Sequence, residues 1–158
     1  ELKNHFIPDA GVSAAIDGWM GPLLGHKDFE IFDTWYEIKC VNEGALQVTV
    51  SSLEQLDSDI EGHLAIVCLE EASAVSTASF NLNQLILRIM DMEKFRIKLD
   101  NMGYAADAEY DNYNFIYKGT QRYKINEKFP RLTRKDVGSS IGNVKYTLLL
   151  NGIKNYME

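Results

Sequence analysis

The 158-residue sequence has few of the residues that build disulfide frameworks or zinc sites, with only two cysteines and three histidines. Cys40 and Cys68 both lie in apolar runs and form no C-x-x-C pair, which predicts buried free thiols in a reducing compartment. The histidines are scattered along the chain, whereas a zinc site needs clustered nitrogen and sulfur ligands. Both shortages argue against a disulfide-stabilised secreted domain and against a zinc protein.

Long hydrophobic runs and phosphate-binding glycine loops are also missing. The longest apolar run is LAIVCL, residues 64–69, far below the roughly 18 residues of a membrane span. The opening ELKNHFIPDAG has neither the basic start nor the apolar core of a signal peptide, so we expect a cytoplasmic protein without a membrane partner. Because the chain begins with glutamate rather than methionine, further residues can precede it. Neither G-x-x-x-x-G-K nor G-x-G-x-x-G occurs, which disfavours nucleotide-binding folds.

Positive charge is scarce overall, since the formal net charge is -7, and this counts against a general coat for nucleic acid. One stretch departs from the average, because seven basic residues and a single acidic one, Glu127, lie between Lys118 and Lys135. An acidic protein can still present one basic surface. We therefore expect Arg131, Arg134 and Lys135 to contact DNA or a partner protein.

Hydrophobic periodicity predicts one mixed α/β domain with a central sheet. A helix at the start is expected to end at Pro8, and the strongest helical pattern covers residues 81–104 with Gly103 as its stop. The predicted strands are 28–32, 35–41, 45–51, 63–71, 113–119, 121–126 and 144–150, with short helices at 52–59 and at the end of the chain. The order predicts a core of residues 1–103, including the long helix, and a β-rich extension, 104–158, packed on the same domain.

The stretch HKDFEIFDTWYEIKC, residues 26–40, places Asp28 nine positions ahead of the triplet Glu37-Ile38-Lys39. If the two strands are joined by a turn with an even number of residues, even positions of the first share a face with odd positions of the second. Asp28, Glu30, Glu37 and Lys39 then lie on one face. An odd-length loop breaks this alignment, and the sequence leaves both lengths open.

Three carboxylates and an ammonium on one patch suit hydrolysis of a phosphodiester. Carboxylates make a hard oxygen site for Mg²⁺ or Mn²⁺, which activates water and stabilises charge on the transition state. A lysine one strand repeat away can orient that water and offset charge on the phosphate. A charged, solvent-exposed strand face explains the same residues simply, because D-x(8)-E-x-K occurs often by chance.

The wider context resembles the PD-(D/E)XK superfamily of restriction-endonuclease-like nucleases. The runs DFE, EIK, SSLEQL and FPRL, in this order, resemble a PD-(D/E)XK family associated with bacterial restriction and phage-defence gene clusters. The resemblance covers nearly the whole chain. It implies a restriction-endonuclease-like αβββαβ core, with a mixed central sheet flanked by helices and with the acid and the E-x-K on adjacent strands. It also implies a metal-dependent endonuclease that cuts DNA.

By this resemblance, Asp28 and Glu37 are metal-binding carboxylates, Lys39 is the catalytic lysine, and the backbone carbonyl of Ile38 is a further ligand of Mg²⁺ or Mn²⁺. Related nucleases often carry a glutamate on the first core helix, and Glu1 fits that position.

The strict superfamily pattern has proline before the aspartate, where this chain has Lys27. Gln55 either reaches the catalytic site, as a glutamine does in several related nucleases, or is a first-turn residue with its side chain in water. The alternative to an active nuclease is a catalytically inactive nuclease-fold subunit that serves DNA binding or complex assembly. A double-strand cutter is expected to form a homodimer or to act with other restriction-system subunits.

Overall fold

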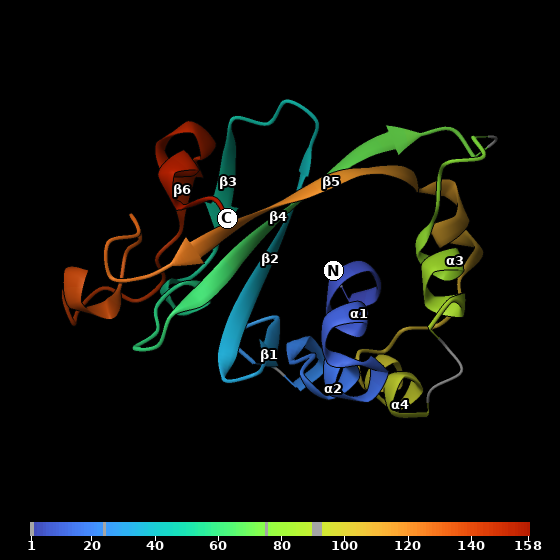
Figure 1. The fold of residues 1–158 in the computed structure, drawn as a ribbon, viewed down its shortest axis with the longest axis horizontal. Coiled ribbons are helices and arrows are strands. Elements are labelled where there is room, and N and C mark those ends of the chain that lie inside the picture. Colours follow the sequence, from blue (N-terminus) through green and yellow to red (C-terminus); the bar gives the residue numbers. More distant parts are fainter. Residues whose placement is uncertain (1, 24, 75, 90–92) are drawn as a thin grey trace.

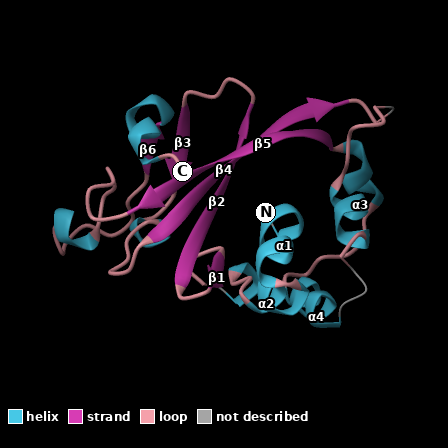
Figure 2. Cartoon of the chain, in the orientation of Figure 1, coloured by secondary structure: helices cyan, strands magenta, loops and turns pink. Residues whose placement is uncertain are grey.

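A computed structural model describes residues 2–23, 25–74, 76–89 and 93–158 of the 158-residue chain. The helical elements are η1 (Leu2–Phe6), α1 (Ile7–Ala10), α2 (Val12–Asp17), η2 (Gly21–Leu23), η3 (Leu53–Gln55), α3 (Leu82–Leu87), α4 (Glu93–Asn101), η4 (Ala108–Asn112), η5 (Arg134–Asp136) and η6 (Leu150–Tyr156). The strands are β1 (Phe29–Ile31), β2 (Thr34–Asn42), β3 (Gln47–Val50), β4 (Gly62–Ala72), β5 (Asn114–Ile125) and β6 (Tyr146–Leu149). Figure 2 shows how helices and strands are distributed.

The central sheet has four strands in the order β1-β2-β4-β5 (Figure 1). β1 and β2 pair antiparallel, β2 and β4 parallel, and β4 and β5 antiparallel, so the prediction of a mixed central sheet is confirmed. β4 is the apolar run that the sequence predicts to be a buried strand, and it occupies an inner position. Its register places Leu64 beside Glu37 and Ile66 beside Lys39.

The hairpin of β1 and β2 closes through the two-residue turn Phe32-Asp33. Both residues have positive φ, 53° and 61°, as a type I′ turn requires. The loop is therefore even in length, and Glu30 faces Trp35 across the pair. The side chains of Glu37 and Lys39 share the Trp35 face of the sheet, because alternate residues of a strand point to the same side.

The third predicted strand, β3, lies outside the central sheet and pairs antiparallel with β6. The pairing joins segments about 100 residues apart, with Val48 opposite Leu148. Buried side chains of this two-stranded sheet pack with Trp35 and Leu64 in one hydrophobic cluster. The β3-β6 sheet thus covers the Trp35 face of the central sheet, on the side away from α1 and α2 in Figure 1.

The helices cover the other face of the central sheet. Phe29 and Ile31 of β1 are buried against Phe6 and Ala15. The start of the chain stays helical through Pro8, contrary to the prediction, because proline is tolerated in the first turn of α1. Gly11, with φ 79°, separates α1 from α2.

The predicted helix over 81–104 is two helices, α3 and α4, with residues 90–92 outside the described ranges. Ile89 and Phe95 are buried in one cluster with Ile16 of α2. Six residues make about 1.7 helical turns, so on one straight helix these two side chains would point about 120° apart. Two helices at an angle let both reach the same core. Gly103, with φ 72°, follows α4 as predicted.

Two further predictions change in the structure. β5 is one strand where the sequence predicted two, since Gly119 with φ 130° continues the chain across a register shift opposite Cys68 and Leu69. Neither cysteine forms a disulfide, but Cys40 is exposed and Cys68 half-buried, where the sequence predicted two buried thiols. Within the described ranges, every helix is too short or too polar to cross a membrane.

Candidate active site

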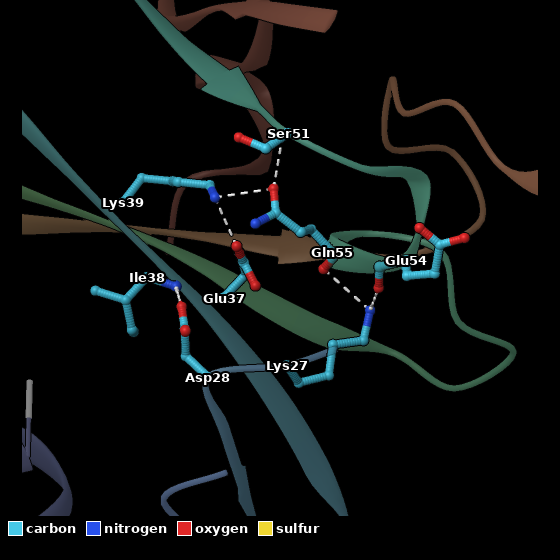
Figure 3. A network of polar contacts seen from close by, with 8 residues as sticks. All are labelled: Lys27, Asp28, Glu37, Ile38, Lys39, Ser51, Glu54 and Gln55. Carbon is cyan, nitrogen blue, oxygen red and sulfur yellow. Dashed lines mark hydrogen bonds and ion pairs between the residues drawn. The ribbon is translucent and has the colours of Figure 1, made fainter. Parts of the chain in front are cut away.

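Asp28 stands at the start of the β1-β2 hairpin, where the two strands separate. Its backbone N–H donates to the Tyr36 carbonyl at 3.1 Å, and its Oδ2 accepts from the Ile38 N–H at 2.7 Å (Figure 3). The N–H and C=O of one strand residue point to the same side, so the Ile38 carbonyl faces this edge as well. The Asp28 carboxylate and the Ile38 backbone are therefore neighbours, as the resemblance implied for two ligands of one metal.

Glu37 and Lys39 form an ion pair on β2, and Gln55 joins it from η3. Lys39 Nζ lies 2.6 Å from Glu37 Oε1 and 2.9 Å from Gln55 Oε1 (Figure 3). Gln55 Oε1 also accepts from the Ser51 N–H at 2.7 Å. The side chain of Glu37 is 3% exposed and that of Lys39 is 14% exposed. Gln55 therefore lies in the same cluster, and its side chain is fixed between β2 and the end of β3.

Burial gives Glu37 an unusual protonation equilibrium. The pKa of its carboxyl is raised from 4.5 to about 7, chiefly because the side chain is removed from water; the charge of Asp28 also raises this pKa, whereas Lys39 and Lys27 lower it. The two carboxylates thus repel each other at the distance the fold imposes. A cation bound between them would offset this repulsion and favour the ionised form of Glu37.

The oxygen donors suit a hard divalent ion. Asp28, Glu37 and the Ile38 carbonyl supply two carboxylates and one carbonyl, the donor types that Mg²⁺ takes while it keeps several waters. The described residues contain no group of three or more His, Cys, Asp or Glu side chains that could hold a metal ion. Two carboxylates and one carbonyl leave the remaining positions of a six-coordinate ion to water, so this donor set fits a water-rich Mg²⁺ or Mn²⁺ site rather than a closed protein cage. Glu1 lies outside the described residues.

Lys27 has a structural role that the sequence analysis did not identify. It is 9% exposed, and its Nζ donates to the backbone carbonyls of Glu54 at 2.7 Å and of Gln55 and Asp57 at 3.0 Å (Figure 3). The same ammonium lies 3.8 Å from the centre of the Trp35 ring. Burial lowers its pKa from 10.5 to about 8. The only signal in the sequence was its position directly before Asp28.

Arg131 binds the same loop. Its guanidinium donates to the carbonyls of Leu56 and Ser58, the latter at 3.0 Å. Between them, Lys27 and Arg131 therefore engage every backbone carbonyl from residue 54 to residue 58. The structure thus gives Arg131 an internal contact, and its predicted contact with DNA or a partner protein stays a prediction.

Arg134 and Lys135 lie beside that loop with their side chains in solvent. Arg134 Nη2 is 3.0 Å from Glu54 Oε1, and its backbone N–H donates to Asp57. Its side chain is 50% exposed. Lys135 is 89% exposed and lies 3.9 Å from Asp59. Both cations therefore border the loop that carries Gln55.

Restriction-endonuclease-like proteins have a mixed sheet with an acid and a Glu-x-Lys triplet on two adjacent strands. The chain matches, over residues 1–151, the model of the family described as "Putative PD-(D/E)XK family member, (DUF4420)". It belongs to this family, whose fold is nuclease-like. Neither the curated proteins nor the solved structures contain a match to the chain.

Proposed function

We propose that the chain is a metal-dependent endonuclease that hydrolyses phosphodiester bonds of DNA, within a bacterial restriction or phage-defence system. The observation that carries this proposal is the convergence of Asp28, Glu37 and Lys39 at the edge of β2, where Lys39 Nζ lies 2.6 Å from Glu37. Asp28 and Glu37, with the Ile38 carbonyl, would hold Mg²⁺ or Mn²⁺.

The residues divide the chemistry between them. A bound divalent ion lowers the pKa of a coordinated water and stabilises negative charge on the phosphate. Lys39 has contacts to Glu37 and Gln55, which leaves one of its three N–H donors for the attacking water or a phosphate oxygen. Its positive charge offsets the charge that develops on the phosphate. Gln55 holds the ammonium in place through its 2.9 Å contact.

DNA would approach over the loop of residues 54–58. Arg134 and Lys135 border this loop and keep exposed cationic side chains, which suit contacts to backbone phosphates. Arg134 pairs with Glu54 and Lys135 with Asp59, as Lys118 pairs with Glu70 and Lys124 with Glu61, so a phosphate would compete with a carboxylate at each of these cations. A second copy of the chain, or another subunit of such a system, would supply the second cut in a duplex.

A non-cleaving role in DNA binding or complex assembly is the second candidate. One observation favours it: Glu37 Oε1 is held by Lys39 at 2.6 Å, so this oxygen must leave its partner, or share it, to bind a metal. In such a subunit, the ion pair would stabilise the fold and the site would bind no divalent ion.

Cleavage of supercoiled plasmid in Mg²⁺ or Mn²⁺ tests the proposal. The variants are Glu37→Gln and Lys39→Met, which keep the size of each side chain, with Asp33→Asn as the control. Asp33 is an exposed turn residue with φ 61° on the same hairpin, where asparagine fits the backbone.

We expect nicking by the wild type and by Asp33→Asn, and a loss of about 100-fold or more in the other two. If the wild type leaves the plasmid intact with both metals, or if Glu37→Gln cleaves as well as the wild type, the nuclease proposal is wrong.

A further inference from the structure

We propose that Lys27 is a positioning residue of the candidate active site, which holds the loop of residues 54–58 so that Gln55 meets Lys39. The proposal rests on the proposed function for its catalytic readout and adds a residue to that site. Lys27 is adjacent in sequence to Asp28, on one side of the site, and its ammonium reaches the loop on the other side (Figure 3).

Lys27 donates to backbone atoms, which makes the connection between the β1-β2 hairpin and the loop rigid. One ammonium has three donors, and here all three are used, on the carbonyls of Glu54, Gln55 and Asp57 at 2.7–3.0 Å. Hydrogen bonds from a charged donor in a buried position are stronger and shorter than neutral ones. The ammonium also lies over the Trp35 ring, in the core of the domain. The loop is thereby tied to the β1-β2 hairpin.

Lys27 holds Gln55 through the backbone carbonyl of Gln55. Its carbonyl accepts from Lys27 at 3.0 Å, while its side-chain Oε1 accepts from Lys39 at 2.9 Å. The same residue thus connects the buried lysine with the lysine of the ion pair. Without Lys27, three carbonyls of η3 and the residues directly after it would lose a buried partner, and the loop would move toward water to satisfy them. Gln55 Oε1 would then be held beside Lys39 by the Ser51 N–H alone.

Lys98 offers a matched control elsewhere in the chain. Its Nζ also donates to three backbone carbonyls, those of Ile16, Asp17 and Trp19, at the end of α2 in the helical layer. Lys98→Met therefore removes the same kind of interaction as Lys27→Met without touching β2 or the loop. A purely structural role for Lys27 predicts that both variants lose stability and behave alike in every other assay.

The first experiment measures the position of Lys39 itself and needs no activity. Lysines labelled with ¹³C at Cε are observed by NMR, and the Lys39 signal is assigned with Lys39→Arg. We expect Lys27→Met and Gln55→Ala to shift this signal in the same direction, and Lys98→Met to leave it in place. If Lys27→Met does not fold, Lys27→Arg replaces it, because a guanidinium keeps the charge but cannot direct three donors from one nitrogen. An unmoved Lys39 signal overturns the proposal.

The second experiment is a double-mutant cycle on the single-turnover cleavage rate at saturating metal and DNA. Misplacement of a catalytic group commonly costs about 10- to 100-fold. We expect a loss of this size in Lys27→Met, none in Lys98→Met, and no further loss when Lys27→Met is added to Gln55→Ala. Equal losses in both backgrounds overturn the proposal. If the wild type cleaves no DNA but the Lys39 signal moves, the proposed function fails and the positioning role of Lys27 stands.

Discussion

The buried carboxyl of Glu37 makes the stability of the protein depend on pH in a defined window. Its pKa is about 7 in the folded state and 4.5 when exposed, as in the unfolded chain. The folded state therefore binds more protons between these values, and the free energy of unfolding falls as the pH rises. The full shift corresponds to about 3 kcal/mol, of which about 2 kcal/mol falls between pH 5 and pH 7.5.

The substitution Glu37→Gln isolates this effect. Glutamine keeps the shape and an acceptor for Lys39 but does not titrate, so the variant lacks the loss of stability that the wild type shows. Urea unfolding of both proteins at several pH values, in the presence of a chelator, gives the difference between their free energies of unfolding at each pH. Relative to Glu37→Gln, the wild type should lose about 2 kcal/mol from pH 5 to pH 7.5, or about 4 to 8 °C in Tm for a domain of this size.

Addition of Mg²⁺ extends the same measurement. At pH 7.5 a site of two carboxylates gains affinity as Glu37 ionises, so Mg²⁺ should stabilise the wild type, by about 2.7 kcal/mol at 100 times its dissociation constant. The Glu37→Gln protein should gain much less. In the metal-free experiment, a difference in free energy of unfolding between the two proteins that stays constant from pH 5 to pH 7.5 would refute the assignment of Glu37 as a buried, titrating carboxyl.

Three further predictions concern stability and are tested by urea midpoints. Gly62→Ala should destabilise the fold by about 3 kcal/mol, because the new Cβ would lie 2.1–2.6 Å from atoms of the Trp35 ring. An unchanged urea midpoint would contradict this packing. Phe32→Asn should stabilise the fold by about 0.5 to 1 kcal/mol, since Phe32 is 71% exposed and has φ 53°, a conformation that asparagine tolerates. A lower urea midpoint would contradict the positive φ of this turn residue. Arg131→Met should cost about 2 to 3 kcal/mol, because the Leu56 and Ser58 carbonyls lose a charged partner; a neutral effect would show that water replaces it.

The local parts of the fold were predictable from the sequence because they follow from short-range geometry. The alternation of strand residues is enough to place Glu37 and Lys39 on one face of β2, whereas the length of the turn before them came only from the structure. The apolar run of β4 predicted a buried strand, and positive φ at Gly103 matches its role as a helix stop.

The features that were missed depend on contacts between distant segments. β3 pairs with β6 about 100 residues away, and nothing in four alternating residues specifies a partner. Lys27 binds backbone carbonyls 27 to 30 positions along the chain, and carbonyls have no sequence signature. Arg131 belongs to a basic stretch that suggested DNA, yet its guanidinium binds the same loop. A charged residue with an internal backbone partner looks, in sequence, like a surface charge.

Titration calorimetry with Mg²⁺ and with Mn²⁺ measures whether Asp28 and Glu37 hold one divalent ion. The proteins are the wild type, Asp28→Asn, which keeps an acceptor for the Ile38 N–H, and the hairpin control Asp33→Asn. We expect one metal site in the wild type and in Asp33→Asn, and its loss in Asp28→Asn. Absence of binding by the wild type at millimolar metal, or unchanged binding by Asp28→Asn, would contradict this expectation.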